Sequence, residues 1–192
     1  MLTHLRPAFV IMAFFTLLTG LGYPLLFTAL AQVILPGKAG GSVITKDGAV
    51  VGSRLIGQRF TSDKYFHGRP SAAGADGYDA SASSGSNLGP LSKKLTDRVA
   101  ADVAALQAAG ARGIPADAVT TSASGLDPHI SATFAGLQVD RIAKARGLTP
   151  DTVQTILARH IETPFFGVFG EMRVNVLELN LDLDAQSNPP VG

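Results

Sequence analysis

Apolar residues are concentrated at the front of this 192-residue chain. No Asp, Glu, Lys, Arg or His occurs between residues 7 and 37, and all 15 acidic residues follow Lys38. Residues 9–27 hold eleven Leu, Ile, Val and Phe side chains, each of which favours bilayer insertion by roughly 0.3 to 0.6 kcal/mol. Since about 20 apolar residues cross a hydrocarbon core, the pattern predicts a transmembrane anchor helix over residues 7–35.

Two local features bear on this anchor. Gly20, Gly22 and Pro24 are expected to bend or loosen its far end. Residues 29–31 (Ala-Leu-Ala) have the small-x-small pattern of a signal peptidase site, so a secreted domain released after Ala31 is the alternative. The apolar run before that site exceeds the roughly 7 to 15 residues of a signal core, which favours an uncleaved anchor.

The flanks of the anchor predict its orientation. Residues 1–6 carry Arg6, His4 and the amino terminus, and short basic tails stay in the cytoplasm. We therefore expect a short cytoplasmic tail and an extracytoplasmic main domain. Four cations that follow the span weaken this asymmetry: Lys38, Lys46, Arg54 and Arg59.

The polar remainder, residues 36–192, is predicted to be one soluble mixed domain of the α+β class. Apolar and β-branched runs at residues 42–45 and 49–56, separated by Lys-Asp-Gly, predict a β-hairpin. Residues 71–90 are rich in Ser, Gly, Ala and Asp, which predicts a long irregular loop.

Three helices are expected after this loop. The first has apolar residues at helical spacing and is closed by Gly110. A second is expected after Pro128, ending at Gly147, and a third has Thr149 as its N-cap and Pro150 as its first residue. The apolar positions of the first helix are Leu91, Leu95, Val99, Val103 and Leu106.

The end of the chain alternates between apolar and polar residues. This alternation over residues 172–183 predicts a closing β-strand. Its phase slips between Val176 and Leu177, which indicates a bulge or burial on both faces.

Motifs for catalysis are missing from the sequence. There is no Cys, no G-x-S-x-G, no H-E-x-x-H and no Walker A loop. The four His residues are widely separated, so no metal site is expected. After Arg6, 15 basic residues balance 15 acidic ones, which gives no charge argument for binding nucleic acid. The sequence predicts no catalytic residue.

Two turns rich in Ser and Gly are candidate anion sites, because each precedes a predicted helix N-terminus. They span residues 84–90 and 122–128, and the second contains Ser124 and Gly125. Loop geometry and capping need the same residue types, and this interpretation is favoured.

Gln138 and Arg141 interrupt the apolar stripe of the second predicted helix. An unpaired polar group there costs roughly 1 to 3 kcal/mol. Gln138 must therefore be hydrogen-bonded inside the fold, which is favoured, or face a ligand or partner.

Six motifs, in order along the chain, indicate which known family the sequence resembles. With its single N-terminal span, the chain resembles the C subunit of the bacterial Kdp potassium-transporting ATPase nearly end to end. The motifs are GSRLIGQ at 52–58, YFHGRPS at 65–71, GSNLGP at 85–90, SGLDPHIS at 124–131, QVDRIA at 138–143 and RVNVL at 173–177.

The resemblance implies a non-catalytic accessory subunit of a complex that imports potassium across the bacterial inner membrane using ATP. Its partners would be a channel-like A subunit, a P-type B subunit and a small F subunit. Consistent with this role, the chain lacks an Asp-Lys-Thr-Gly phosphorylation motif. No cofactor of its own is implied, and ATP enters only through the complex.

The resemblance also implies a catalytic chaperone that raises the ATP affinity of the B subunit, with Gln138, near Ser124 and Gly125, as a nucleotide contact. The predicted orientation conflicts with this role, because it places the domain across the membrane from cytoplasmic ATP. Two hypotheses remain open. One is an assembly subunit that docks on the extracytoplasmic face of the A subunit, and the other is a nucleotide-assisting regulator.

Overall fold

The computed structural model describes residues 2–187, in two compact units that divide between Ser53 and Arg54. The first unit holds the apolar anchor and the predicted hairpin. The second holds a mixed domain of helices and a small antiparallel sheet. The predicted class, an N-terminal apolar helix followed by a mixed α and β domain, is confirmed.

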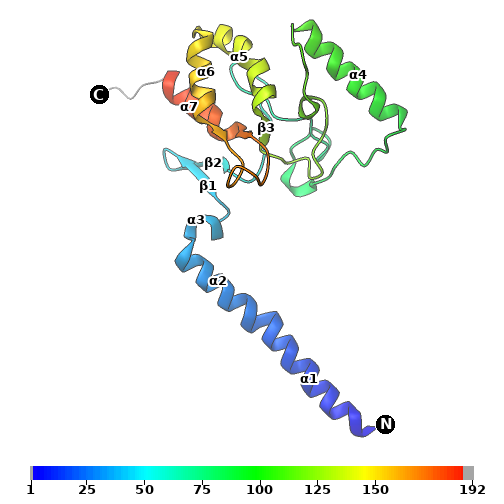
Figure 1. Ribbon diagram of the computed structural model, residues 1–192. Coiled ribbons are helices and arrows are strands. Elements are labelled where there is room, and N and C mark those ends of the chain that lie inside the picture. The colour runs from blue at the N-terminus through cyan, green and yellow to red at the C-terminus, as the bar shows by residue number, and fades with distance from the viewer. Residues whose placement is uncertain (1, 188–192) are drawn as a thin grey trace. The chain divides into compact units, whose positions relative to one another are not determined.

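The anchor is one helix of 30 residues, Leu5–Ile34, and it is long and apolar enough to cross a membrane. It begins after a short 3-10 turn, η1, and is followed by the short helix α3 (Figure 1). The segments of this unit are η1 (Leu2–His4), α1 (Leu5–Leu17), η2 (Leu18–Gly22), α2 (Tyr23–Ile34) and α3 (Pro36–Ala39).

The middle of the anchor departs from α-helical geometry at η2, which is a π-helical segment. There the Tyr23 N–H donates to the carbonyl of Leu18, five residues earlier. Pro24 has no N–H and its ring crowds the preceding turn, so a wider turn next to it accommodates the ring. The prediction that the helix is loosened around Gly20, Gly22 and Pro24 is confirmed, but the loosened segment lies in the middle of the helix and not at its far end.

The predicted hairpin is confirmed as well. Strand β1 (Val43–Lys46) pairs with β2 (Ala49–Ser53) in antiparallel register. The turn between them has φ of 53° at Asp47 and 77° at Gly48, the left-handed conformation that a two-residue hairpin loop requires.

The second unit packs its helices around a three-stranded antiparallel sheet of order β3-β5-β4. Helices α5, α6 and α7 lie together, whereas α4 lies on the other side of the domain (Figure 1), where Val99, Val103 and Leu106 pack against the core. Its elements are η3 (Ala80–Ala82), α4 (Lys93–Ala108), η4 (Ala116–Ala118), β3 (His129–Ser131), α5 (Ala132–Arg146), α6 (Pro150–Arg159), β4 (Ile161–Glu162), β5 (Arg173–Asn175) and α7 (Val176–Ser187).

All three predicted helices form, as α4, α5 and α6. Gly147 ends α5 with φ of 67°, and the Thr149 hydroxyl caps α6 by accepting a hydrogen bond from the Thr152 N–H. The start of α5 was predicted too early, because Ile130 lies in β3, where it pairs with Val174. Ser131 is the actual N-cap, and its side chain accepts from the Phe134 N–H.

The predicted closing strand over residues 172–183 is wrong for most of its length. Only β5 is extended, and the chain turns into α7 at the point of the phase slip. Asn175 supports this turn because its side-chain oxygen accepts a hydrogen bond from the Glu178 N–H. The alternating leucines hid a helical pattern in which residues 176, 177, 179, 180 and 183 are buried.

Candidate functional site

Gln138 lies on α5 with only 6% of its surface exposed. Its side-chain oxygen accepts a hydrogen bond from the His67 N–H at 2.8 Å, and its side-chain nitrogen donates to the His67 carbonyl at 3.1 Å. The same oxygen accepts a bond from Arg141 at 2.8 Å. Both ends of the amide are therefore paired inside the fold, as a buried amide requires.

Helix α7 supplies a matching amide to the residue before His67. Asn180, which is 2% exposed, accepts from the Phe66 N–H at 2.8 Å and donates to the Phe66 carbonyl at 3.0 Å. Two consecutive residues are thus held as if in a β-ladder, but by side-chain amides instead of a neighbouring strand. The sequence interpretation missed Asn180 because it treated this segment as a strand.

Two arginines of α5 bind the carbonyls that precede Phe66. Arg141 donates to the carbonyls of Asp63 at 2.7 Å and Tyr65 at 3.0 Å. Arg146 donates to the carbonyl of Lys64 at 2.6 Å. Five consecutive carbonyls therefore accept hydrogen bonds from side chains of α5 and α7. We call this arrangement the clasp, which consists of residues 63–67 and the side chains of Gln138, Arg141, Arg146 and Asn180.

An ion pair fixes one end of the clasp. The side chain of Arg146 is 6% exposed and lies 2.9 Å from the Asp184 carboxylate. The Tyr65 hydroxyl donates to the same carboxylate at 3.1 Å, and the Arg146 guanidinium sits 4.9 Å from the centre of the Tyr65 ring. Burial, together with the neighbouring Asp184, raises the pKa of Tyr65, so this hydroxyl stays a hydrogen-bond donor.

Burial also changes the electrostatics of the clasp. It lowers the pKa of His67 despite the 3.0 Å contact of the ring with the Ser62 carbonyl, which acts in the opposite direction. Burial lowers the pKa of Arg141 as well, and Asp63 opposes this shift. A guanidinium remains charged in proteins, so Arg141 is a cation held among backbone carbonyls.

Ser124 and Gly125 lie in a separate loop that is occupied with internal bonds. The Ser124 carbonyl accepts from the Ser84 N–H at 3.0 Å, and the Ser124 hydroxyl accepts from the Leu126 N–H at 3.1 Å. Gly125 has φ of 67°, and a Cβ there would lie 2.6 Å from the Ser84 carbonyl oxygen. The turn thus uses its Ser and Gly for close loop packing.

The same turn organises the predicted loop over residues 71–90. The Ser71 hydroxyl donates to the Gly125 carbonyl at 2.6 Å and accepts from the Tyr78 N–H at 2.8 Å. The Tyr78 hydroxyl donates to the Arg69 carbonyl at 2.7 Å, and burial raises the pKa of Tyr78 to about 12. Although irregular, the loop is tied to the domain by specific hydrogen bonds.

The cavity beside Gln138 does not include the other two candidate ligand residues, Ser124 and Gly125. This cavity has a volume of about 450 Å³, and its lining also includes His67, Arg141 and Lys144. Cations beside a polar amide suit an anion, although the amide and Arg141 are already engaged by the clasp.

A second cavity, of about 670 Å³, contains several charged groups that are already paired. Asp127 accepts from Arg69 at 3.1 Å and from the His129 N–H at 3.0 Å. Burial acts to raise the pKa of Asp127, but the bonds from His129 and the charge of Arg69 outweigh it and leave that pKa below its usual value. Asp117 accepts from the Ser131 N–H and hydroxyl. These carboxylates hold loops in place.

Within residues 2–187, no group of three or more His, Asp and Glu is placed to hold a metal ion. The side chains of the clasp bind backbone groups of residues 63–67, and Arg146 also binds the Asp184 carboxylate.

A family model described as the c chain of the K⁺-transporting ATPase, KdpC, matches residues 5–185. The chain belongs to the KdpC family. The matched range includes the anchor helix, the hairpin and the whole clasp. The resemblance seen in the sequence motifs is therefore confirmed.

Curated relatives extend the likeness over both units of the chain. Proteins named as potassium-transporting ATPase KdpC subunits are similar over nearly their full length. That of Gemmatimonas aurantiaca is 57% identical over 189 residues, covering 97% of this chain and 95% of the relative. That of Caulobacter vibrioides is 56% identical over 191 residues, with 98% and 96% covered. That of Koribacter versatilis is 55% identical over 176 residues, with 91% of each covered.

Proposed function

We propose that this chain is the non-catalytic, membrane-anchored C subunit of an ATP-driven potassium import complex. The KdpC match over residues 5–185 carries the proposal. An apolar helix of 30 residues supports the membrane anchor. The clasp supports the non-catalytic role, because its amides and guanidinium groups bind the chain's own carbonyls.

The proposed partners are the other subunits of the same complex. They are a channel-like A subunit, a P-type B subunit that hydrolyses ATP and a small F subunit. The anchor lies in the bilayer of the bacterial inner membrane, where it forms a single span between the short tail and the main domain. The domain assembles or stabilises the complex by docking on the A subunit.

The orientation we propose places the tail in the cytoplasm and the main domain outside. It is supported by Arg6 before the span, since short basic tails are retained in the cytoplasm. In this orientation the domain meets the face of the A subunit where ions enter. Gln138 then lies across the membrane from cytoplasmic ATP.

A single introduced thiol tests the orientation, because the chain has no Cys. Ser83 is exposed, so Ser83→Cys in the assembled complex should react with a membrane-impermeant maleimide in intact cells. Thr3→Cys, in the exposed tail, is the matched control and should react only after permeabilisation. The reverse pattern, with Ser83→Cys protected and Thr3→Cys labelled, contradicts the proposed orientation.

The nucleotide-assisting role is the second candidate, and one observation favours it. Gln138, Arg141 and Lys144 border the 450 Å³ cavity, where two cations suit a phosphate group. In this alternative Gln138, Ser124 and Gly125 contribute to the ATP affinity of the complex, although Ser124 and Gly125 do not border this cavity. It requires the domain on the cytoplasmic side, so the labelling experiment separates the two candidates.

A further inference from the structure

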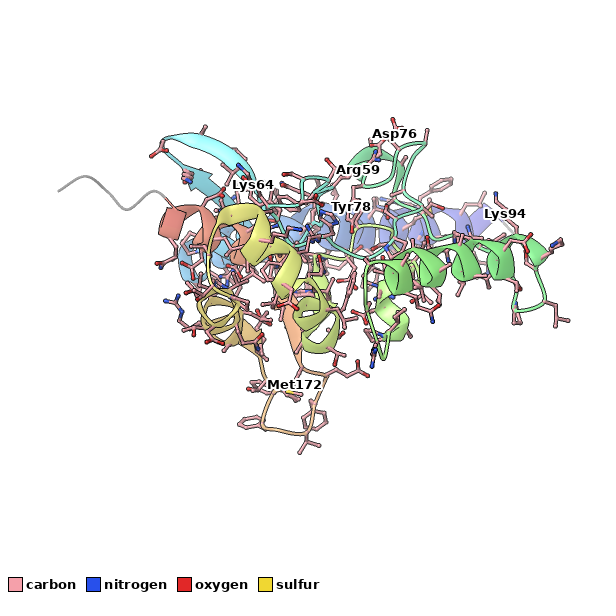
Figure 2. All side chains as sticks on the ribbon, turned by 90° about the horizontal axis from the view of Figure 1, so that it is seen from above. Arg59, Lys64, Asp76, Tyr78, Lys94 and Met172 are labelled. Atoms are coloured by element: carbon pink, nitrogen blue, oxygen red, sulfur yellow. The ribbon has the colours of Figure 1, made fainter. Side chains whose placement is uncertain are left out.

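The turn between β4 and β5 exposes large apolar side chains. The exposed fractions are 68% for Phe165, 82% for Phe166, 75% for Val168 and 70% for Phe169. Figure 2 shows the turn projecting away from the helices, with Met172 near its base. We call residues 165–169 the apolar knob.

The knob keeps its shape through backbone bonds across its base. The Phe165 N–H donates to the Phe169 carbonyl at 2.9 Å, and the Phe169 N–H donates to the Phe165 carbonyl at 3.0 Å. The backbone of the turn is therefore paired within itself while its side chains point outward. This arrangement presents apolar surface without leaving those two N–H groups unpaired.

Charge is confined to the base of the knob. Residues 163–170 contain no charged side chain. Just beyond them, Arg173 pairs with Glu162 at 2.8 Å, and Glu171 is exposed. The result is an apolar tip above a polar collar. Contiguous exposed apolar surface of this kind is typical of protein or membrane contacts.

We propose that the apolar knob inserts into the interfacial region of the bilayer and gives the domain a second membrane contact. Lipid is always available to the domain, because the chain's own helix Leu5–Ile34 tethers the domain to a bilayer. Tethering raises the effective concentration of lipid around the knob. The exposed apolar tip, in which the centres of the Phe165 and Phe166 rings lie 4.3 Å apart, suits a fluid apolar medium, and the collar then stays among headgroups and water.

This inference goes beyond the proposed function, since it depends neither on the orientation nor on a partner subunit. The chain has no Trp, so Phe166→Trp creates a single fluorophore at the tip. The full chain is reconstituted in phosphatidylcholine vesicles with brominated acyl chains in both leaflets. The expected result is a blue-shifted emission, quenched about twofold or more relative to unbrominated vesicles.

Leu91→Trp is the matched control, because Leu91 is 98% exposed and precedes the exposed Lys93 and Lys94. Its emission should stay red and unquenched. Adding Val168→Asp to Phe166→Trp should abolish the quenching, because a carboxylate opposes insertion. Circular dichroism should be unchanged by these substitutions.

Two results overturn the proposal. One is Phe166→Trp emission that matches the Leu91→Trp control in brominated vesicles. The other is a blue shift of the Phe166→Trp emission that appears only when the remaining subunits of the complex are present and is not accompanied by bromine quenching. This result would mean that the knob contacts a protein surface. Neither result changes the family or the anchored role of the chain.

Discussion

The clasp and the apolar knob are both irregular segments of the same domain, and their chemistry is opposite. In the clasp, five carbonyls over residues 63–67 accept bonds from side chains, and Phe66 is fully buried. In the knob, which projects away from the helices (Figure 2), Phe166 is 82% exposed. The comparison separates the groups that hold the domain together from the surface that it offers outward.

The comparison predicts its largest effect at Asn180. Asn180→Ala leaves the N–H and carbonyl of Phe66 unpaired in the interior. The free energy of unfolding should fall by about 2 to 4 kcal/mol. Urea unfolding of the full chain in detergent, followed by circular dichroism, measures the loss. Gln186→Ala, at an exposed position of α7, is the control and should change stability by less than about 0.5 kcal/mol.

Gln138→Ala should have the next largest effect. It removes the two bonds to His67 and one partner of Arg141, so unfolding should become easier by about 1 to 3 kcal/mol. The control is Gln154→Ala, which removes the same side-chain atoms from an exposed position of α6. If the two variants are equally stable in urea, the clasp is not holding residues 63–67.

Acidification should weaken the clasp by a smaller amount. Burial lowers the pKa of His67 in the folded state, so the unfolded chain takes up the proton first as the pH falls. This contribution to stability is present above the unfolded pKa of about 6.5 and is lost as the pH falls from there through the folded pKa. Between pH 7.5 and 5.5, His67→Gln should therefore lose less stability than the unsubstituted chain. Parallel losses in the two proteins would show that His67 is not responsible.

The smallest effect on folding is expected in the knob. Phe166→Ser removes an aromatic ring that is 82% exposed, so stability should change by less than about 0.5 kcal/mol. The same urea experiment checks this value. A loss of about 2 kcal/mol would mean that the ring packs against the domain, and the contrast with the clasp would then disappear.

Local sequence signals predicted the elements whose causes are local. Asp47 and Gly48 specify the hairpin turn, and Thr149 with Pro150 specifies the start of α6. The apolar stretch of the anchor needs no tertiary partner to be recognised. These predictions succeeded because the deciding residues are neighbours in the chain.

The partners within the clasp could not be predicted from the sequence. The hydrogen bonds of Gln138 to His67 span 71 residues, and those of Asn180 to Phe66 span 114. Sequence patterning marked Gln138 as a buried amide that needs a partner, but it did not identify the partner. Asn180 was missed because alternating leucines over residues 177–183 resemble a strand as closely as a helix.

The ATP concentration for half-maximal activity of the assembled complex tests the central claim, that the Gln138 amide serves the clasp and not a nucleotide. The measurement compares the complex that contains Gln138→Ala with the complex that contains the unsubstituted chain. Both chains must be folded at the temperature of the assay, and the two complexes must have the same subunit composition. Our account predicts the same half-saturating ATP concentration within about a factor of two. A severalfold higher concentration in the Gln138→Ala complex, with assembly unchanged, would contradict it.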